Sequence, residues 1–141
     1  MSTLSSAQRR KQSLKAIGMF TQYLFKRNKK LANLISIRIR FRKLYDAWGI
    51  CDHHDVGIKP REFTIYINNA LTDEKDIIST VAHEMVHVWQ YSTGKLRDYH
   101  SPLHRFNDDI YDANMRYRDM PWEIEARKLE KVLYKHWVEH A

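Results

Sequence analysis

Cysteine and long apolar runs are nearly missing from this chain of 141 residues. The single cysteine, Cys51, excludes an internal disulfide framework and any zinc ribbon built from several cysteines. No apolar run approaches the ~20 residues that a membrane helix needs, and the N-terminus lacks a secretory pattern. No repeat, low-complexity tract or linker interrupts the sequence. We therefore expect one domain over residues 1–141, in a reducing, cytoplasmic setting.

Acidic residues are scarce in the N-terminal half. Residues 1–60 hold 13 Lys and Arg against three acids, whereas residues 61–141 hold 11 against 14, within a net charge of +7. Such asymmetry indicates contact with nucleic acid or an acidic partner, and the alternative is a solvated basic face. Residues 1–30 contain no acid, as in transit peptides. Their apolar stripe favours a basic N-terminal helix instead.

Hydrophobic periodicity predicts an α+β fold. Helical spacing covers residues 7–28, with Ser5 or Ser6 as the cap, and residues 73–92, which end before Gly94. Further helices are expected over about residues 103–117 and from Pro121 to the end. Residues 35–42, 44–51 and 61–68 read as strands of a small antiparallel or mixed sheet.

The strand over residues 35–42 alternates strictly between apolar and polar side chains. Arg38, Arg40 and Arg42 share its polar face and are candidates for phosphate contacts, although such residues are more often only solvated. The strand over residues 63–67 could pair with an extended substrate if it lies at a sheet edge.

The segment "VAHEMVHVWQ" carries the strongest chemical signal. On a helix, His83 and His87 lie one above the other and can present imidazole nitrogens to one cation. Zn²⁺ accepts neutral imidazole, and a catalytic zinc site leaves one position open to water. Glu84 lies about 100° round the helix, where it can act as general base rather than as a ligand.

A third protein ligand is needed, and the residues alone leave several candidates open. These are His100, His104, Glu123 and Glu125. Two other histidine pairs, at 53–54 and at 136 and 140, fit surface or packing roles better.

The order "WGICDHHDVGIKPREFTIYINNAL", "VAHEMVHVWQ", "RDYHSPLHRF" resembles the SprT-like zinc metalloprotease domain over residues 45–110. The resemblance implies a G-x-C strand with Gly49 and Cys51, an edge strand in "IYIN", and His100 as the third zinc ligand. Ser101 replaces the family's usual glycine, and His104 stands where the family has an aromatic residue. His104 therefore stays open as a ligand or as a group near the reacting carbonyl. Compact versions without a zinc ribbon resemble those of bacteriophages.

A rival pattern comes from the gluzincins, in which a glutamate on a later helix ligates the metal in an E-x-x-A context. Glu123 begins "EIEA", and Glu125 precedes Ala126. The alternative is an acidic first turn that the helix dipole favours.

We therefore expect a zinc-dependent metallopeptidase that acts on a protein substrate, with DNA-associated proteins as one candidate class. Glu84 would take the proton of the attacking water. Candidates for the oxyanion stabiliser or substrate contact are Tyr91, Tyr99, His104 and Arg105. Two alternatives remain: a nucleic-acid-binding protein in which zinc has only a structural role, and an interaction module without metal.

Overall fold

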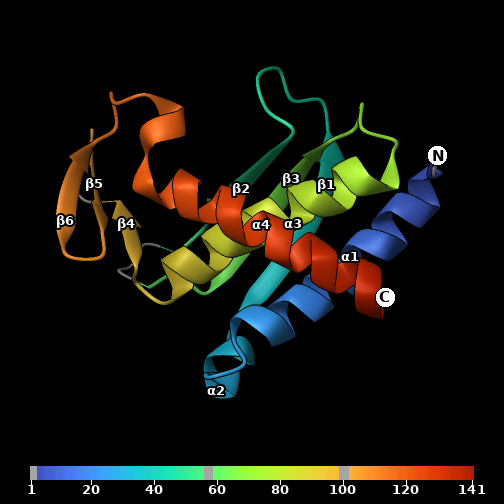
Figure 1. Ribbon diagram of the computed structural model, residues 1–141, viewed down its shortest axis with the longest axis horizontal. Helices are drawn as coiled ribbons and strands as arrows, with labels where there is room; N and C mark the ends of the chain where they lie inside the picture. The colour runs from blue at the N-terminus through green and yellow to red at the C-terminus, as the bar shows by residue number, and fades with distance from the viewer. Residues whose placement is uncertain (1–2, 56–58, 99–101) are drawn as a thin grey trace.

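The computed structural model describes residues 3–55, 59–98 and 102–141. Its element order confirms the predicted α+β class (Figure 1). The helices are α1 (Ser6–Leu24), α2 (Lys29–Ala32), α3 (Glu74–Ser92) and α4 (Pro121–His140), with a 3₁₀ turn η1 (Tyr117–Asp119). The strands are β1 (Ser36–Arg42), β2 (Gly49–His53), β3 (Glu62–Asn68), β4 (Leu96–Asp98), β5 (Leu103–Phe106) and β6 (Asp109–Asp112).

The first sheet is mixed, with the order β1-β3-β2. β1 is parallel to β3, with Ile39 opposite Ile65, and β2 is antiparallel to β3, with Cys51 opposite Ile65. Ile39 and Ile65 are almost fully buried. The alternation of apolar and polar residues therefore turns one face of the sheet toward the helices, as the sequence predicts.

β3 is the central strand, which corrects the expectation that this strand lies at the edge. After β1 the chain forms β2 at the far edge of the sheet, and β3 then fills the place between them, so β1 and β2 both pair with β3. Both sides of β3 are occupied, and it cannot accept a substrate strand. Within the described residues, the unpaired edges of this sheet belong to β1 and β2.

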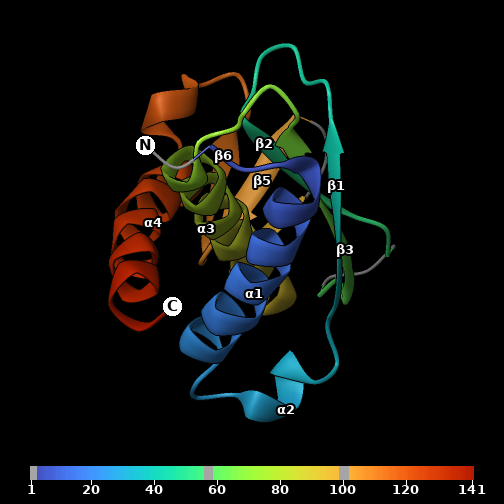
Figure 2. The same ribbon diagram turned by 90° about the vertical axis from the view of Figure 1, so that its right-hand side faces the viewer.

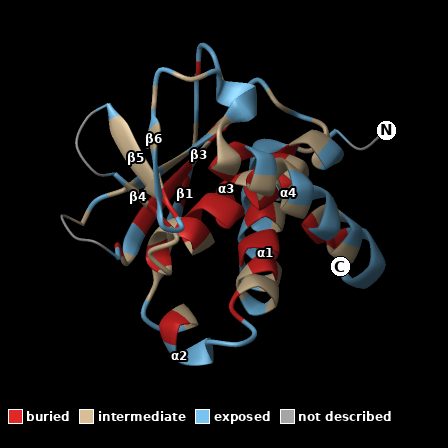
Figure 3. Ribbon diagram, turned by 60° about the vertical axis from the view of Figure 1, so that its left-hand side comes forward, coloured by how far each residue is buried: buried red, intermediate tan, exposed pale blue. Residues whose placement is uncertain are grey.

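α3 lies in the middle of the domain. The sheet packs on one side of it, α4 crosses its other side, and α1 runs beside it (Figure 2). Most α3 residues are buried (Figure 3). A helix covered on several sides is strongly apolar, and its few buried polar groups must then find partners within the protein.

The ends of α1 and α3 follow local chemistry. Ser5 and Gln8 form a capping box at the start of α1, which confirms Ser5 as the cap. α1 ends at Leu24, four residues earlier than the sequence predicts. α3 ends before Gly94, whose φ of 79° suits glycine at this position.

Residues 103–117 do not form the helix that the sequence predicts. They contain β5 and β6, which join β4 in a second three-stranded sheet. A two-residue connection begins at Asn107, whose φ of 56° turns the chain sharply between Phe106 and Asp109. Leu96, Phe106 and Trp122 form a small core beneath this sheet. Turn chemistry therefore overrides the weak helical spacing here.

The second predicted strand is shifted. It covers Gly49–His53 rather than residues 44–51, and residues 44–48 belong to the connection from β1. None of the helices in the described residues is long and apolar enough to cross a membrane.

Gly49 marks a close approach of β2 to α3. A Cβ atom at this position would lie 2.6 Å from Thr80 Cγ2 and 3.1 Å from Glu84 Cγ. By contrast, a Cβ atom on Gly18, in the exposed part of α1, meets no atom within 4 Å.

We predict that Gly49→Ala lowers the free energy of unfolding by about 1–3 kcal/mol, because the added methyl group overpacks this contact. The matched variant Gly18→Ala should raise it by up to ~1 kcal/mol, through better helix propensity. Urea denaturation measures both. Equal stability of Gly49→Ala and the wild-type protein would show that the contact is not tight.

Candidate metal centre

Three side chains from two helices converge on one point. His83 and His87 lie one turn apart on α3, with ring centroids 5.0 Å apart. Glu123 comes from the first turn of α4, where that helix crosses α3 (Figure 1). Its carboxylate lies 2.9 Å from His83 Nε2 and 3.2 Å from His87 Nε2. One ligand atom from each of the three lies within 4.8 Å of the others, so the group could hold a metal ion.

The second ring nitrogen of each histidine is held by another side chain. His83 Nδ1 lies 2.8 Å from Glu130 Oε1, and His87 Nδ1 lies 2.8 Å from Gln90 Oε1. The Gln90 amide orientation is fixed, because its Nε2 donates to Trp122 O and to Glu125 Oε1. Both Nδ1 atoms must therefore donate their hydrogens, which leaves both Nε2 atoms free of hydrogen in the neutral rings.

With neutral rings, these contacts leave only hydrogen-bond acceptors facing one another at the centre of the group. Unprotonated Nε2 atoms of His83 and His87 would face the carboxylate of Glu123, and all three are acceptors. A cation between them removes this repulsion, and so would protons at the cost of two adjacent buried charges. Two imidazoles and one carboxylate are also a ligand set that Zn²⁺ accepts. The residues present therefore fit a divalent metal ion.

The charges of the group make metal binding depend on pH. Burial lowers the pKa of His83, but hydrogen bonds to Glu123 and Glu130 outweigh this and raise it to about 10. Burial raises the pKa of Glu123, but hydrogen bonds from the two histidines hold it well below its usual range. Protons on these histidines therefore compete with a metal ion for the site. Metal binding must displace them and weakens as the pH falls.

Glu84 stands next to these ligands without joining them. It is only 6% exposed, and its carboxylate lies beside Gly49 at the start of β2. Burial raises its pKa, while the nearby His87 and His83 lower it in part. No described residue donates a hydrogen bond to this carboxylate. It therefore remains available to a ligand or water in the adjoining cleft.

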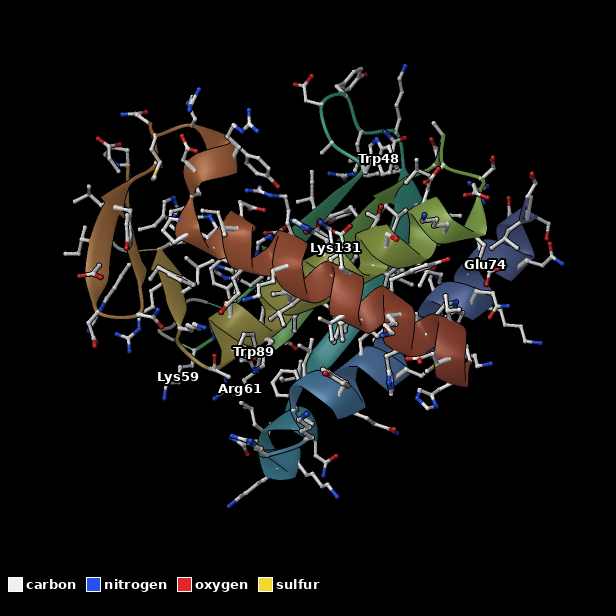
Figure 4. The ribbon with its side chains drawn as sticks, in the orientation of Figure 1. Trp48, Lys59, Arg61, Glu74, Trp89 and Lys131 are labelled. Carbon is white, nitrogen blue, oxygen red and sulfur yellow. The ribbon has the colours of Figure 1, made fainter. Side chains whose placement is uncertain are left out.

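A cleft of about 1020 Å³ opens over the group. α4 forms one wall, and β2 with the end of the β1–β2 connection forms the other. Trp48 from that connection and Lys131 from α4 belong to the two walls (Figure 4). His83, Glu84, His87 and Glu123 all line this cleft.

The other candidates for the third ligand lie elsewhere or are not described. Glu125 binds Lys95 and Gln90. His104 Nδ1 lies 3.1 Å from Asp98 Oδ1, and its ring packs on Trp122. His100, like Tyr99, lies outside the described residues, so its role as third ligand stays a prediction. Of the described candidates, only Glu123 reaches His83 and His87.

The structure places the candidates for substrate contact in different parts of the protein. Tyr91 lines the cleft, and its hydroxyl lies 3.4 Å from Asp98 Oδ1, whereas the side chain of Arg105 binds Asp108. Arg38, Arg40 and Arg42 are exposed on β1, on the sheet face turned away from the helices and hence from the metal group.

The sequence analysis did not identify three residues that contact the His/His/Glu group. Glu130 lies seven residues after Glu123, two helical turns along α4, and that spacing could have revealed it. Gln90 lies three residues after His87, and its contact with the histidine follows helical spacing too. Tyr117 precedes α4, and its hydroxyl donates to Glu123 Oε1 at 2.7 Å. No local pattern points to Tyr117.

Comparison with protein families gives one match, to the model of the SprT-like family over residues 16–116. The chain belongs to the SprT-like family. The match begins within α1 and continues through the HExxH helix to β6, and it confirms the resemblance read from the motifs. α4, with Glu123 and Glu130, lies beyond the matched residues. Comparison with curated proteins and with solved structures finds no match.

We predict that Glu130→Gln weakens metal binding about 10–100-fold, because the amide orients His83 less well and removes a nearby negative charge. A competition titration with a chromogenic zinc chelator at pH 8 measures the affinity. Glu139→Gln is the matched control, since Glu139 is exposed near the end of the same helix. Equal affinities of the two variants would argue against a role for Glu130.

Proposed function

We propose that this SprT-like protein is a zinc-dependent metallopeptidase. The observation that carries the proposal is the position of Glu84. This buried carboxylate lies beside His83 and His87, at the floor of a cleft and without a donor among the described residues. Family membership and the His/His/Glu group support the same reading.

Each residue of the group has a distinct task. A bound zinc ion supplies a Lewis acid that polarises a carbonyl and lowers the pKa of water. Glu84 accepts the proton of the attacking water and passes it to the leaving amine. We propose His83, His87 and Glu123 as the metal ligands, with Glu130, Gln90 and Tyr117 as the residues that orient them. His100 remains the competing prediction for the third position.

The substrate is a polypeptide that lies in the cleft. β2 forms one wall, and within the described residues its outer edge is unpaired. An extended peptide can add to such an edge through main-chain hydrogen bonds. This assigns to β2 the pairing role that the sequence analysis gave to β3.

We predict that Glu84→Gln retains one zinc per chain but lowers the rate of casein cleavage at least 100-fold, because the general base is lost. Elemental analysis and release of labelled peptides measure the two properties. Glu139→Gln, which is exposed near the end of α4 and does not line the cleft, is the control and should keep its activity. Cleavage by Glu84→Gln at the wild-type rate would contradict the mechanism.

A nucleic-acid-binding function is the second candidate, because the arginines of β1 are exposed. Arg42 also stacks on the ring of Tyr66, with 4.0 Å from Cζ to the ring centroid. Together with Arg38 and Arg40 it presents charge on the open face of the sheet. If zinc only staples such a binding protein, metal removal unfolds it and Glu84→Gln has no effect on its function.

For this surface we predict that replacing the three arginines by Gln reduces the affinity for single-stranded DNA and flattens its salt dependence by about two to three units of log–log slope. The control replaces Lys26, Lys29 and Lys30, near α2, by Gln. Fluorescence anisotropy at several salt concentrations gives the slopes. If both variants show the same salt-dependence slope, the β1 arginines do not take part in DNA binding.

A further inference from the structure

One wall of the cleft carries a continuous row of cations. The three cations are Arg127, Lys128 and Lys131, which follow helical spacing on α4 and line the cleft beside Ile124. The row starts next to Glu123. From Glu123, Arg127 is roughly 6 Å along the helix axis and Lys131 roughly 12 Å.

These cations have no carboxylate partner among the described residues. The neighbouring acids of α4 are engaged elsewhere, Glu125 with Lys95 and Glu130 with His83. Arg127 donates to the carbonyl of Arg118 at 2.6 Å, which leaves its charge uncompensated. Like charges three or four residues apart destabilise a helix slightly, so the row carries a cost that folding does not explain.

The opposite wall has a different character. Trp48 and Ile50 are 57% and 41% exposed, and Asp46 is the acid on that side. Two acids of the floor, Glu123 and Glu130, hold histidines, and the third, Glu84, is the general base of the proposed function. An extended ligand in the cleft thus has an apolar, strand-like wall on one side and free positive charge on the other (Figure 4).

We propose that this cleft selects peptides with acidic side chains roughly two to four residues from the scissile bond. This rests on the proposed peptidase function. The range follows from the positions of Arg127 and Lys131, because an extended peptide rises about 3.3 Å per residue. A main chain paired with β2 directs alternate side chains toward α4, where the two lysines and Arg127 meet their carboxylates.

The test uses zinc-loaded Glu84→Gln, which binds without cleaving. Two fluorescent twelve-residue peptides share four central apolar residues and carry either Glu or Lys on both flanks. We expect about tenfold tighter binding of the Glu-flanked peptide at 50 mM salt, and less at 500 mM salt, because exposed ion pairs are screened. Fluorescence anisotropy measures both affinities.

Two charge-reversed forms of this protein locate the preference. Lys128→Glu with Lys131→Glu should abolish or invert it, whereas Lys29→Glu with Lys30→Glu changes the net charge equally at α2, away from the cleft, and should retain it. Equal binding of both peptides, no binding of either, or a preference that survives the α4 reversal would overturn the proposal. So would a single-stranded oligonucleotide that displaces the Glu-flanked peptide and loses affinity on the α4 reversal.

The test of peptide selectivity can fail independently of the test of peptidase activity. Cleavage of casein by the zinc-loaded wild-type protein tests the peptidase activity alone. If casein is cleaved and the two peptides bind equally, only the selectivity fails. If casein remains intact and the Glu-flanked peptide is preferred, the cleft binds acidic peptides but the peptidase proposal fails.

Discussion

The packing of α4 against α3 brings Glu123 to two imidazole nitrogens that carry no hydrogen when the rings are neutral. Glu130 and Gln90 hold the opposite nitrogens as donors, so the centre requires a cation or extra protons. A buried acceptor cluster of this kind is expensive unless a charge balances it. We therefore propose metal binding as the constraint that explains why so many polar groups lie between two packed helices.

The surrounding packing leaves a cleft over this centre. β2 approaches α3 so closely that Gly49 has no room for a side chain, and this contact places Glu84 at the floor of the cleft. α4 supplies the opposite wall together with two of the carboxylates. In the function that we propose, one helix thus contributes a ligand, a residue that orients a ligand, and a row of cations. That proposal links metal binding, chemistry and selection of substrate through the position of α4.

Local patterns predict the parts of this structure that depend on near neighbours. Helical spacing locates His83, Glu84 and His87, and strict alternation locates β1 and β3. The partner Glu123 is 36 residues beyond His87, and only tertiary packing decides between it and other candidates. The central place of β3 likewise depends on the crossover from β1, which no local pattern encodes. At Asn107, a single turn residue converts an expected helix into a hairpin.

The most direct test of this account is the zinc content of untagged protein, measured by elemental analysis on Glu123→Gln, Glu125→Gln and His100→Ala beside the wild-type protein. Glu125 is the matched control, because it lies on the same turn of α4 but binds Lys95. The account predicts one zinc per chain in the wild-type protein, Glu125→Gln and His100→Ala, and its loss in Glu123→Gln. Retention of zinc by Glu123→Gln with loss in His100→Ala, or no zinc in the wild-type protein, would contradict it.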